Sequence, residues 1–345
     1  MKQYTLTIIN IRYETKDAVT LCFKQPSLRK IKYQAGQFIT LIMRINGRKY
    51  ARPYSLSSAP SVDSFLEITV KRVTEGIVSN YINTELKVGD VIEVIEPMGG
   101  FTYKTSNHGK TIYLWGVGSG ITPLFSLTKE ILNTHPDTKI FLVYGNKLKE
   151  STIFSKRLLQ LQKEFDSVLN LTYFYSQENT LLEQEKEIKG RITSDFVLNL
   201  VSKNSNCHES VHYICGPKDL KNAVQSSLLE LEVPLSSIFT EEFDLVVDPK
   251  DLEEVEDSNV TVYFHGKQSE FFVPKGESIL DVALNNDVGI PYSCQTGNCN
   301  TCKAKLKEGR VKMIGISKGR SDLAQDEFLL CCSYPITSEV NIEIK

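Results

Sequence analysis

The chain has 345 residues, with 40 basic and 42 acidic side chains and a formal net charge of −2. This length exceeds one ordinary hydrophobic core, so we expect two to three domains, and the balanced charge provides no basic surface for nucleic acid. No apolar run approaches the roughly 20 residues that span a bilayer, and the first residues show no signal-peptide pattern, so we expect a soluble, cytoplasmic protein.

Residues 1–105 contain several short runs that alternate apolar and polar side chains, such as 4–9, 37–43 and 91–97. Alternation with a period of two predicts strands, and the run of strands predicts an antiparallel β-barrel. A short helix is expected at about residues 78–86, after Gly76.

Three segments of this barrel are candidates for binding a flat, phosphorylated ligand. Arg52-Pro53-Tyr54-Ser55 combines a cation for phosphate, an aromatic ring for a heterocycle, and a hydroxyl. Gly76-Ile77-Val78-Ser79 opens the short helix and offers free N–H groups to a pyrophosphate. Residues 97–101 bring another glycine pair to the end of the domain.

In residues 106–243 the pattern is different: short apolar runs typical of strands alternate with amphipathic helical segments. This order predicts a parallel sheet with helices on both faces. The first strand runs into Gly116-Val117-Gly118-Ser119-Gly120-Ile121-Thr122-Pro123, where glycines permit close phosphate approach and Thr122 is expected to cap the next helix. A later strand ends in Cys215-Gly216-Pro217. Because carboxyl ends of parallel strands share one edge, both motifs are expected to line one crevice.

Residues 244–257 hold seven acids and one lysine without a clean period, so we interpret this segment as a solvated linker. Residues 258–345 then read as a hairpin, a helix and a cysteine loop. Cys294, Cys299 and Cys302 have C-x4-C-x2-C spacing, and a Cys331-Cys332 pair follows.

This cysteine spacing is typical of a plant-type [2Fe-2S] cluster, whereas structural zinc prefers two C-x2-C pairs. Adjacent residues on an extended chain point to opposite faces, so only one of the final pair should reach the iron. The order of Cys, Tyr334 and Pro335 resembles plant ferredoxins and selects Cys331, although Cys332 would keep the plant-type loop length. The other cysteines are scattered, so no disulfide framework is expected, and none of the five histidines is assigned chemistry.

Together, the R-x-Y-S, G-x-x-S, G-x-G-S-G-I-T-P and C-G-P motifs resemble the ferredoxin-NADP reductase superfamily. With the cysteine domain, the chain is similar to reductases of multicomponent oxygenases, including the phenylacetyl-CoA epoxidase reductase subunit. The resemblance implies an FAD-binding β-barrel at 1–105, an NAD(P)-binding α/β domain at 106–243, and an α+β, β-grasp ferredoxin domain at 258–345.

The resemblance also implies roles for individual residues. It places Arg52 on the FAD pyrophosphate, Tyr54 and Ser55 on the flavin ring, and Cys215 on the nicotinamide side. By the same resemblance, further residues bind cofactors or line the transfer site: Gly76, Val78, Ser79, Gly116, Gly118, Ser119, Gly120, Thr122, Gly216, Pro217, Glu241 and Phe243. The cluster ligands that it implies are Cys294, Cys299, Cys302 and Cys331. Without its neighbours, Cys215 would be an ordinary buried thiol.

Basic residues at Lys147, Lys149, Lys156 and Arg157 follow the second strand of the α/β domain, and they favour NADPH over NADH. The expected activity is electron transfer from NAD(P)H through FAD and the cluster to an oxygenase component. Two alternatives are a different acceptor, such as a hybrid-cluster protein or a soluble ferredoxin, and a non-enzymatic redox sensor or carrier.

Overall fold

The computed structural model describes residues 2–26, 30–104, 107, 109–178, 186–206, 209–245, 247–316 and 320–344. It divides into two compact units, Met1–Glu242 and Phe243–Lys345, which are described separately. His108, Cys207 and His208, which the sequence left without a role, lie outside the described residues. Among the described helices, none is long and apolar enough to cross a membrane.

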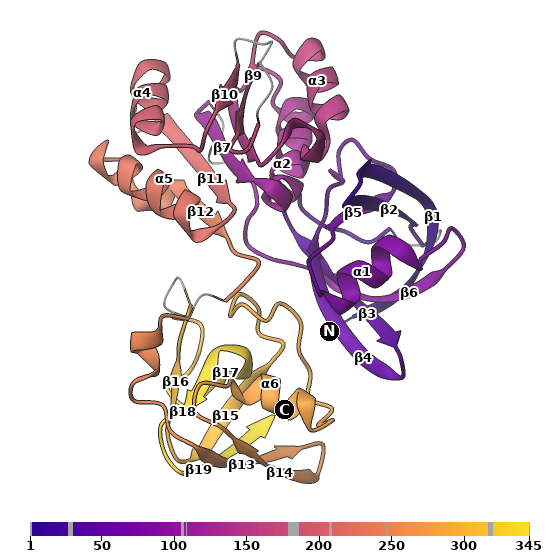
Figure 1. Cartoon of the computed structure of the whole chain (residues 1–345), viewed down its shortest axis with the longest axis vertical. Coiled ribbons are helices and arrows are strands. Elements are labelled where there is room, and N and C mark those ends of the chain that lie inside the picture. The colour runs from indigo at the N-terminus through magenta and orange to yellow at the C-terminus, as the bar shows by residue number, and fades with distance from the viewer. Residues whose placement is uncertain are drawn as a thin grey trace. The chain divides into compact units, whose positions relative to one another are not determined.

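The first sheet of unit 1 is antiparallel, with strand order β4-β3-β6-β1-β2-β5 (Figure 1). A bridge between Leu56, just after β4, and Ile68 in β5 joins the two edges, as a barrel requires. Inward side chains such as Leu21, Leu41 and Val94 form its core. The elements are β1 (Gln3–Thr15), β2 (Ala18–Lys24), β3 (Phe38–Ile45), β4 (Arg48–Ser55), β5 (Leu66–Lys71), α1 (Ile77–Thr84) and β6 (Val91–Met98).

The second sheet of unit 1 is parallel, with strand order β10-β9-β8-β7-β11-β12. The sequence predicted this sheet, but it missed the short edge strand β10, which has only three residues. The strands are β7 (Thr111–Val117), β8 (Ile140–Asn146), β9 (Leu169–Tyr175), β10 (Glu187–Lys189), β11 (Ser210–Cys215) and β12 (Ile238–Glu241), and the helices are α2 (Ile121–Thr134), α3 (Ser155–Glu164), α4 (Ser194–Asn204) and α5 (Lys218–Glu230).

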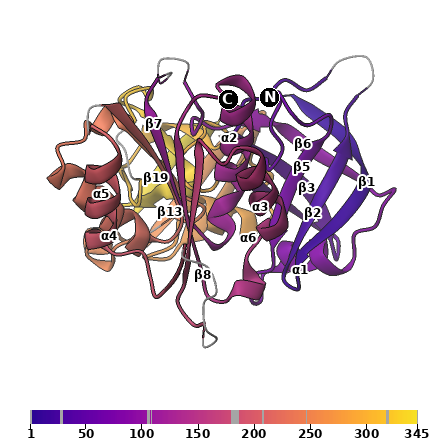
Figure 2. The same cartoon turned by 90° about the horizontal axis from the view of Figure 1, so that it is seen from above.

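Helices cover both faces of this sheet because alternate strand residues point to opposite sides. Ile112 and Leu114 pack with α2 and α3, whereas Tyr113 and Trp115 pack with α4 and α5. Figure 2 shows the two helix pairs on either side of β7 and β8. The bulky Trp115 is therefore buried beneath α4 and α5, on the face opposite α2.

Unit 2 contains a mixed sheet of order β14-β13-β19-β15-β17 and a two-stranded sheet of β16 and β18. Helix α6 packs its apolar residues, among them Ile279 and Ala283, into the same core as the sheet. The elements are β13 (Ser258–Phe264), β14 (Lys267–Val273), α6 (Ile279–Asn285), β15 (Lys303–Glu308), β16 (Val311–Met313), β17 (Glu327–Leu329), β18 (Ser333–Pro335) and β19 (Glu339–Ile344).

The acidic segment before β13 differs from the solvated linker that its composition suggested. Val255 is 1% exposed and packs with Ile314 and Tyr334. Lys312 Nζ lies 3.0 Å from Glu254, so one of the acids pairs within the same unit. Apolar residues spaced between the acids anchor this segment, and the excess of charge hid them.

Candidate redox site

The glycine turn after β7 lies against the Cys215-Gly216 backbone at the end of β11. These strands are parallel neighbours, with Cys215 in register with Gly116. A Cβ atom on Gly120 would lie 2.1 Å from the Cys215 carbonyl oxygen, so only glycine fits there. The structure thus brings the two predicted motifs together at the carboxyl edge of the sheet, as expected.

Helix α2 begins at Ile121, with Gly120 as its N-cap residue and no side-chain cap. The predicted Thr122 cap is wrong, because Thr122 lies inside the first turn and its hydroxyl donates to the Ser119 carbonyl at 2.9 Å. The Tyr144 hydroxyl donates to the Gly118 carbonyl at 3.0 Å and braces the turn from β8. A short 3-10 turn, Gly118–Gly120, leads into the helix, and the Ile121 N–H donates to the Gly118 and Ser119 carbonyls. No side chain caps the helix, so the glycine backbone is what this turn offers to an anionic phosphate.

Cys215 and Glu241 are in register on the neighbouring strands β11 and β12. Burial, and then the charge of Glu241, raise the pKa of the Cys215 thiol well above its usual value. The thiol is therefore neutral and suits a packing surface better than a nucleophile. Pro217 precedes α5 as its N-cap residue, while Phe243 begins the second unit and is 43% exposed.

On the barrel, strand β4 places Arg52 and Tyr54 on one face and Ser55 on the other, where it is buried. The Arg52 guanidinium carbon lies 5.9 Å from the centre of the Tyr50 ring, and Nη1 donates to the Ala51 carbonyl at 2.9 Å. Burial raises the pKa of the Tyr54 hydroxyl, so it stays neutral. Arg52 thus supplies a cation and Tyr54 a neutral aromatic ring on the same face of β4, which fits a phosphorylated, planar flavin.

Helix α1 starts after Gly76, again without a side-chain cap. A Cβ atom on Gly76 would lie 2.6 Å from Ser79 Oγ, so a larger residue here would displace the Ser79 hydroxyl. Ser79 Oγ accepts a hydrogen bond from the Val73 N–H at 3.1 Å, and Val78 is buried. Backbone N–H groups, rather than the serine hydroxyl, are thus what this turn presents to a phosphate.

In unit 2, four buried cysteine thiols converge. The Cys294 sulfur is hydrogen-bonded to those of Cys299 and Cys331, and these bonds lower its pKa. Cys302 is hydrogen-bonded to Cys331, which lowers the pKa of Cys302. The same hydrogen bonds raise the pKa values of Cys299 and Cys331. Four cysteine sulfurs gathered in one buried group are the donor set that a [2Fe-2S] cluster takes.

The Cys332 thiol donates to the Leu329 carbonyl at 3.4 Å, is hydrogen-bonded to Cys331, and is fully buried in the domain core. Gly297, within the cysteine loop, has φ of +74°, and a Cβ there would lie 2.5 Å from Ile316 Cγ2. The loop therefore needs glycine at this position.

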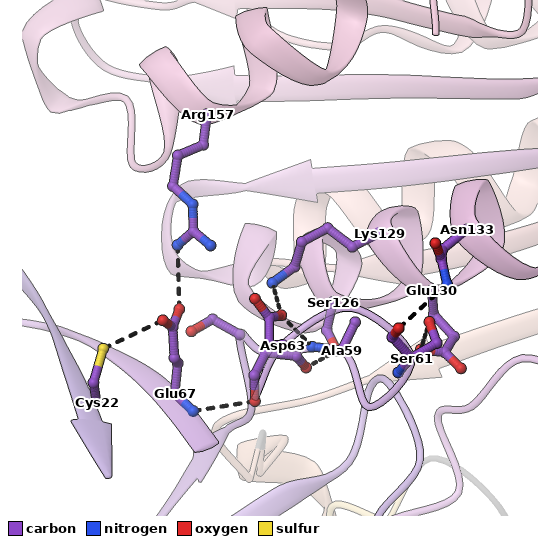
Figure 3. Close-up of polar contacts among 12 residues, drawn as sticks. Cys22, Ala59, Ser61, Asp63, Glu67, Ser126, Lys129, Glu130, Asn133 and Arg157 are labelled. Atoms are coloured by element: carbon purple, nitrogen blue, oxygen red, sulfur yellow. Dashed lines mark hydrogen bonds and ion pairs between the residues drawn. The ribbon is translucent and has the colours of Figure 1, made fainter. Parts of the chain in front are cut away.

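A polar network between the barrel and the α/β domain has no sequence signal. The barrel loop 56–65 contacts α2 through an ion pair between Asp63 and Lys129 and a 2.7 Å hydrogen bond from Ser61 Oγ to Glu130 (Figure 3). Glu67 Oε2 lies 3.3 Å from Arg157 Nη1 at the start of α3. These contacts join the flavin-side barrel to the helices of the nucleotide domain.

The same network bears on the predicted preference for NADPH. Arg157 points toward the barrel carboxylate of Glu67, and Lys149 Nζ lies 2.9 Å from Glu187. Two of the four basic side chains thus already neutralise carboxylates. The preference for NADPH remains a prediction, which now rests on Lys147 and Lys156.

Comparisons with known proteins agree with this arrangement. The chain matches the oxidoreductase FAD-binding domain at residues 5–103, the oxidoreductase NAD-binding domain at 114–226, and the 2Fe-2S iron-sulfur cluster binding domain at 262–336. It is similar to phthalate dioxygenase reductase in fold, with a TM-score of 0.68 and 22% identity over 99% of this chain and 98% of that one.

Two curated relatives cover nearly the whole chain. One of the subunits of 1,2-phenylacetyl-CoA epoxidase from Escherichia coli is 30% identical over 99% of this chain and 97% of its own length. The ferredoxin reductase component of 3-ketosteroid-9-alpha-monooxygenase from Rhodococcus rhodochrous is also 30% identical, over 98% of this chain and 96% of its own.

Fold and site define an NAD(P)H-dependent oxidoreductase that uses FAD and a [2Fe-2S] cluster for electron transfer. Within that class, the chain belongs to the ferredoxin-NADP reductase superfamily, in the group with a C-terminal plant-type ferredoxin domain that supplies oxygenases.

Proposed function

We propose that this protein is the reductase component of a multicomponent oxygenase, with phenylacetyl-CoA epoxidase as the first candidate partner. The observation that carries the proposal is the presence, in one chain, of a glycine turn that lies against the end of β11, an Arg–Tyr strand end and a converging cysteine group. The relatives named for oxygenase systems support the class of acceptor, and they include more than one kind of oxygenase. The choice of the epoxidase rests on one relative at 30% identity.

When bound, FAD accepts a hydride from the nicotinamide and passes electrons singly to the [2Fe-2S] cluster. On the barrel, Arg52 holds the flavin pyrophosphate together with the backbone of Gly76, Val78 and Ser79. Tyr54 flanks the flavin ring and Ser55 approaches its reactive nitrogen. These assignments are supported by the helix start of α1, which no side chain caps, and by the position of Arg52 and Tyr54 on one face of β4.

In the α/β domain, the backbone at the carboxyl edge holds the dinucleotide pyrophosphate. The residues proposed to do so are Gly116, Gly118, Ser119, Gly120, Thr122, Gly216 and Pro217. Cys215 and Glu241 line the nicotinamide side, where the neutral thiol packs against the ring and excludes water. Phe243, which the family resemblance assigns to the flavin side, begins the second unit.

In the ferredoxin domain, Cys294, Cys299, Cys302 and Cys331 are the proposed cluster ligands. The hydrogen bonds of Cys331 to Cys294 and Cys302, together with the turn of Cys332 toward Leu329, support Cys331 as the fourth ligand. Their sulfurs need deprotonation to bind iron. The hydrogen bonds among them lower the pKa values of Cys294 and Cys302 and raise those of Cys299 and Cys331.

An anaerobic titration of the purified holoprotein with NADH and, separately, NADPH tests the electron path. We expect flavin bleaching followed by bleaching of the cluster absorbance. A flavin that is reduced while a bound cluster stays oxidised would contradict the path, and no flavin reduction by either nucleotide would favour the sensor or carrier.

Reconstitution with purified oxygenase components distinguishes the acceptors. We expect product formation with the phenylacetyl-CoA epoxidase oxygenase and not with the 3-ketosteroid oxygenase under equal concentrations. Turnover with a hybrid-cluster protein or a soluble ferredoxin, and with neither oxygenase, would overturn the proposed partner while leaving the reductase activity intact.

A further inference from the structure

An arginine from a distant loop reaches the cysteine loop of the ferredoxin domain. Arg320 Nη1 donates to the Gly297 carbonyl, and Nη2 donates to Asn300 Oδ1. Gly297 and Asn300 lie between Cys294 and Cys302, so one side chain joins two points of the loop that carries three of the proposed ligands. The Arg320 side chain is 15% exposed, which places it within the domain surface rather than in free solvent.

Asp322 fixes the direction of this arginine. Its carboxylate accepts from Arg320 Nε and Nη2 at 2.7 Å each, and Asn300 Nδ2 donates to Asp322 Oδ2 at 3.2 Å. Arg320, Asp322 and Asn300 thus form a closed ring of hydrogen bonds, here called the clasp. A two-point arginine–carboxylate pair sets the orientation of the guanidinium more strictly than a single contact.

The clasp acts on a loop that has little regular structure to hold it. Residues 286–302 form no helix or strand, and their conformation depends on Gly297 at φ of +74°. The two loop residues that the guanidinium contacts, Gly297 and Asn300, lie two and one positions from Cys299, so the charge of Arg320 lies beside a proposed cluster ligand. A cation beside the thiolates stabilises the state of the site that carries more negative charge, which is the reduced state.

We infer that Arg320 is a positioning residue with two effects: it holds the 294–302 loop closed around the [2Fe-2S] cluster, and its charge raises the reduction potential of that cluster. The inference rests on the ligand assignment proposed above. Asp322 supports the first effect by anchoring the arginine, and it offsets part of the second by its own negative charge.

Three variants of the full-length holoprotein separate these effects. Arg320→Gln removes both the positive charge and the guanidinium that contacts two points of the loop. Arg320→Lys keeps the charge but loses the two-point contact. Asp322→Asn keeps the arginine but removes the carboxylate charge that orients it. Arg310→Gln, an exposed arginine of the same domain, is the matched control. The measurements are the rate of iron release to a ferrous chelator and the midpoint potential of the cluster from an EPR-monitored titration.

We expect iron release to be at least about fivefold faster in Arg320→Gln and in Arg320→Lys than in Arg310→Gln, since charge-assisted contacts to the loop are lost. The midpoint potential of the cluster should fall in Arg320→Gln, whereas in Arg320→Lys it should stay close to that of the parent protein. Asp322→Asn should release iron faster than the control at an equal or higher potential.

Release rates and potentials equal to those of the control in all three variants would overturn the inference. If Arg320→Gln fails to load a cluster, the release rate of Asp322→Asn decides whether the clasp holds the loop. An equal fall in midpoint potential in Arg320→Lys and Arg320→Gln would contradict the claim that the charge of Arg320 raises the reduction potential. Cys331→Ser tests the proposed ligand set separately from the clasp. An unchanged cluster EPR signal in that variant would refute the ligand set, while the Arg320 and Asp322 contacts would remain as they are.

Discussion

Glu67 on strand β5 pairs with Arg157 on helix α3, with 3.3 Å between Oε2 and Nη1, although 90 residues separate them. The same carboxylate accepts from Arg12 Nη2 at 2.6 Å and from the Cys22 thiol at 3.2 Å. Burial alone would raise the pKa of Glu67, but the hydrogen bond from Arg12 and the charge of Arg157 outweigh it and lower the pKa to about 2. One carboxylate therefore links the barrel to the nucleotide domain.

Glu67→Gln should destabilise the protein at pH 7 by roughly 3 kcal/mol, because two arginines lose the charge that compensates them in a largely buried site. Urea unfolding followed by fluorescence of the single tryptophan, Trp115, measures the change. The exposed Glu85→Gln is the control and should shift stability by less than about 0.5 kcal/mol. Equal midpoints for both variants would show that the pair contributes nothing.

The buried His212 predicts a loss of stability in mild acid. Trp115 Nε1 donates to His212 Nδ1 at 3.3 Å, and burial lowers the pKa of His212 to about 3. In the unfolded chain, histidine binds a proton near pH 6.5, so the unfolded state holds more protons between these values. This contribution to stability is present above pH 6.5 and declines as the pH falls toward 3, by up to roughly 1.4 kcal/mol per unit.

His212→Gln should flatten the dependence of the unfolding free energy on pH between 5 and 7, as measured by urea titrations at several pH values. The partly buried His135→Gln, at the end of α2, is the control and should keep the slope of the parent protein. A slope that does not change in His212→Gln would assign the acid sensitivity to other groups, such as carboxylates.

Gly120→Ala should weaken nucleotide binding by at least about tenfold, because the new methyl group would overlap the Cys215 carbonyl oxygen at 2.1 Å and separate the two motifs. Calorimetric titration with NADH measures the affinity, and flavin absorbance reports whether the barrel is intact. Gly289→Ala is the control, since nothing lies within 4 Å of a Cβ placed there. Unchanged affinity in Gly120→Ala would contradict the proposed crevice.

Cys331→Ser should abolish the [2Fe-2S] absorbance and EPR signal, whereas Cys332→Ser should retain both, because the thiol of Cys332 points to the Leu329 carbonyl. Cys299→Ser should also lose the cluster. In the Cys299 and Cys331 variants, NAD(P)H-dependent reduction of ferricyanide should remain, since the flavin and nucleotide domains form a separate unit. Loss of the cluster in Cys332→Ser alone would reverse the choice of ligand.

Much of the molecule follows from local sequence patterns. Alternation of apolar residues predicted the barrel and the parallel sheet, because the periods of strands and helices are set by backbone geometry. The cysteine spacing and the glycine turn predicted their chemistry, since a tight loop around a cluster or a phosphate restricts which residues fit. The edge strand β10 was missed because three residues carry too little pattern.

What the sequence determined by itself is the order of the three domains and the cofactors that their motifs suit. Only the tertiary structure decided the pairing of Glu67 with Arg157, the burial of Val255 within an acidic segment, and the reach of Arg320 to Gly297. Each of these joins residues far apart in the chain, and a side chain's partner is set by the packing of whole elements rather than by its neighbours in sequence. The same reason explains why Arg157 resembled a nucleotide-binding cation in the sequence and is a contact between domains in the structure.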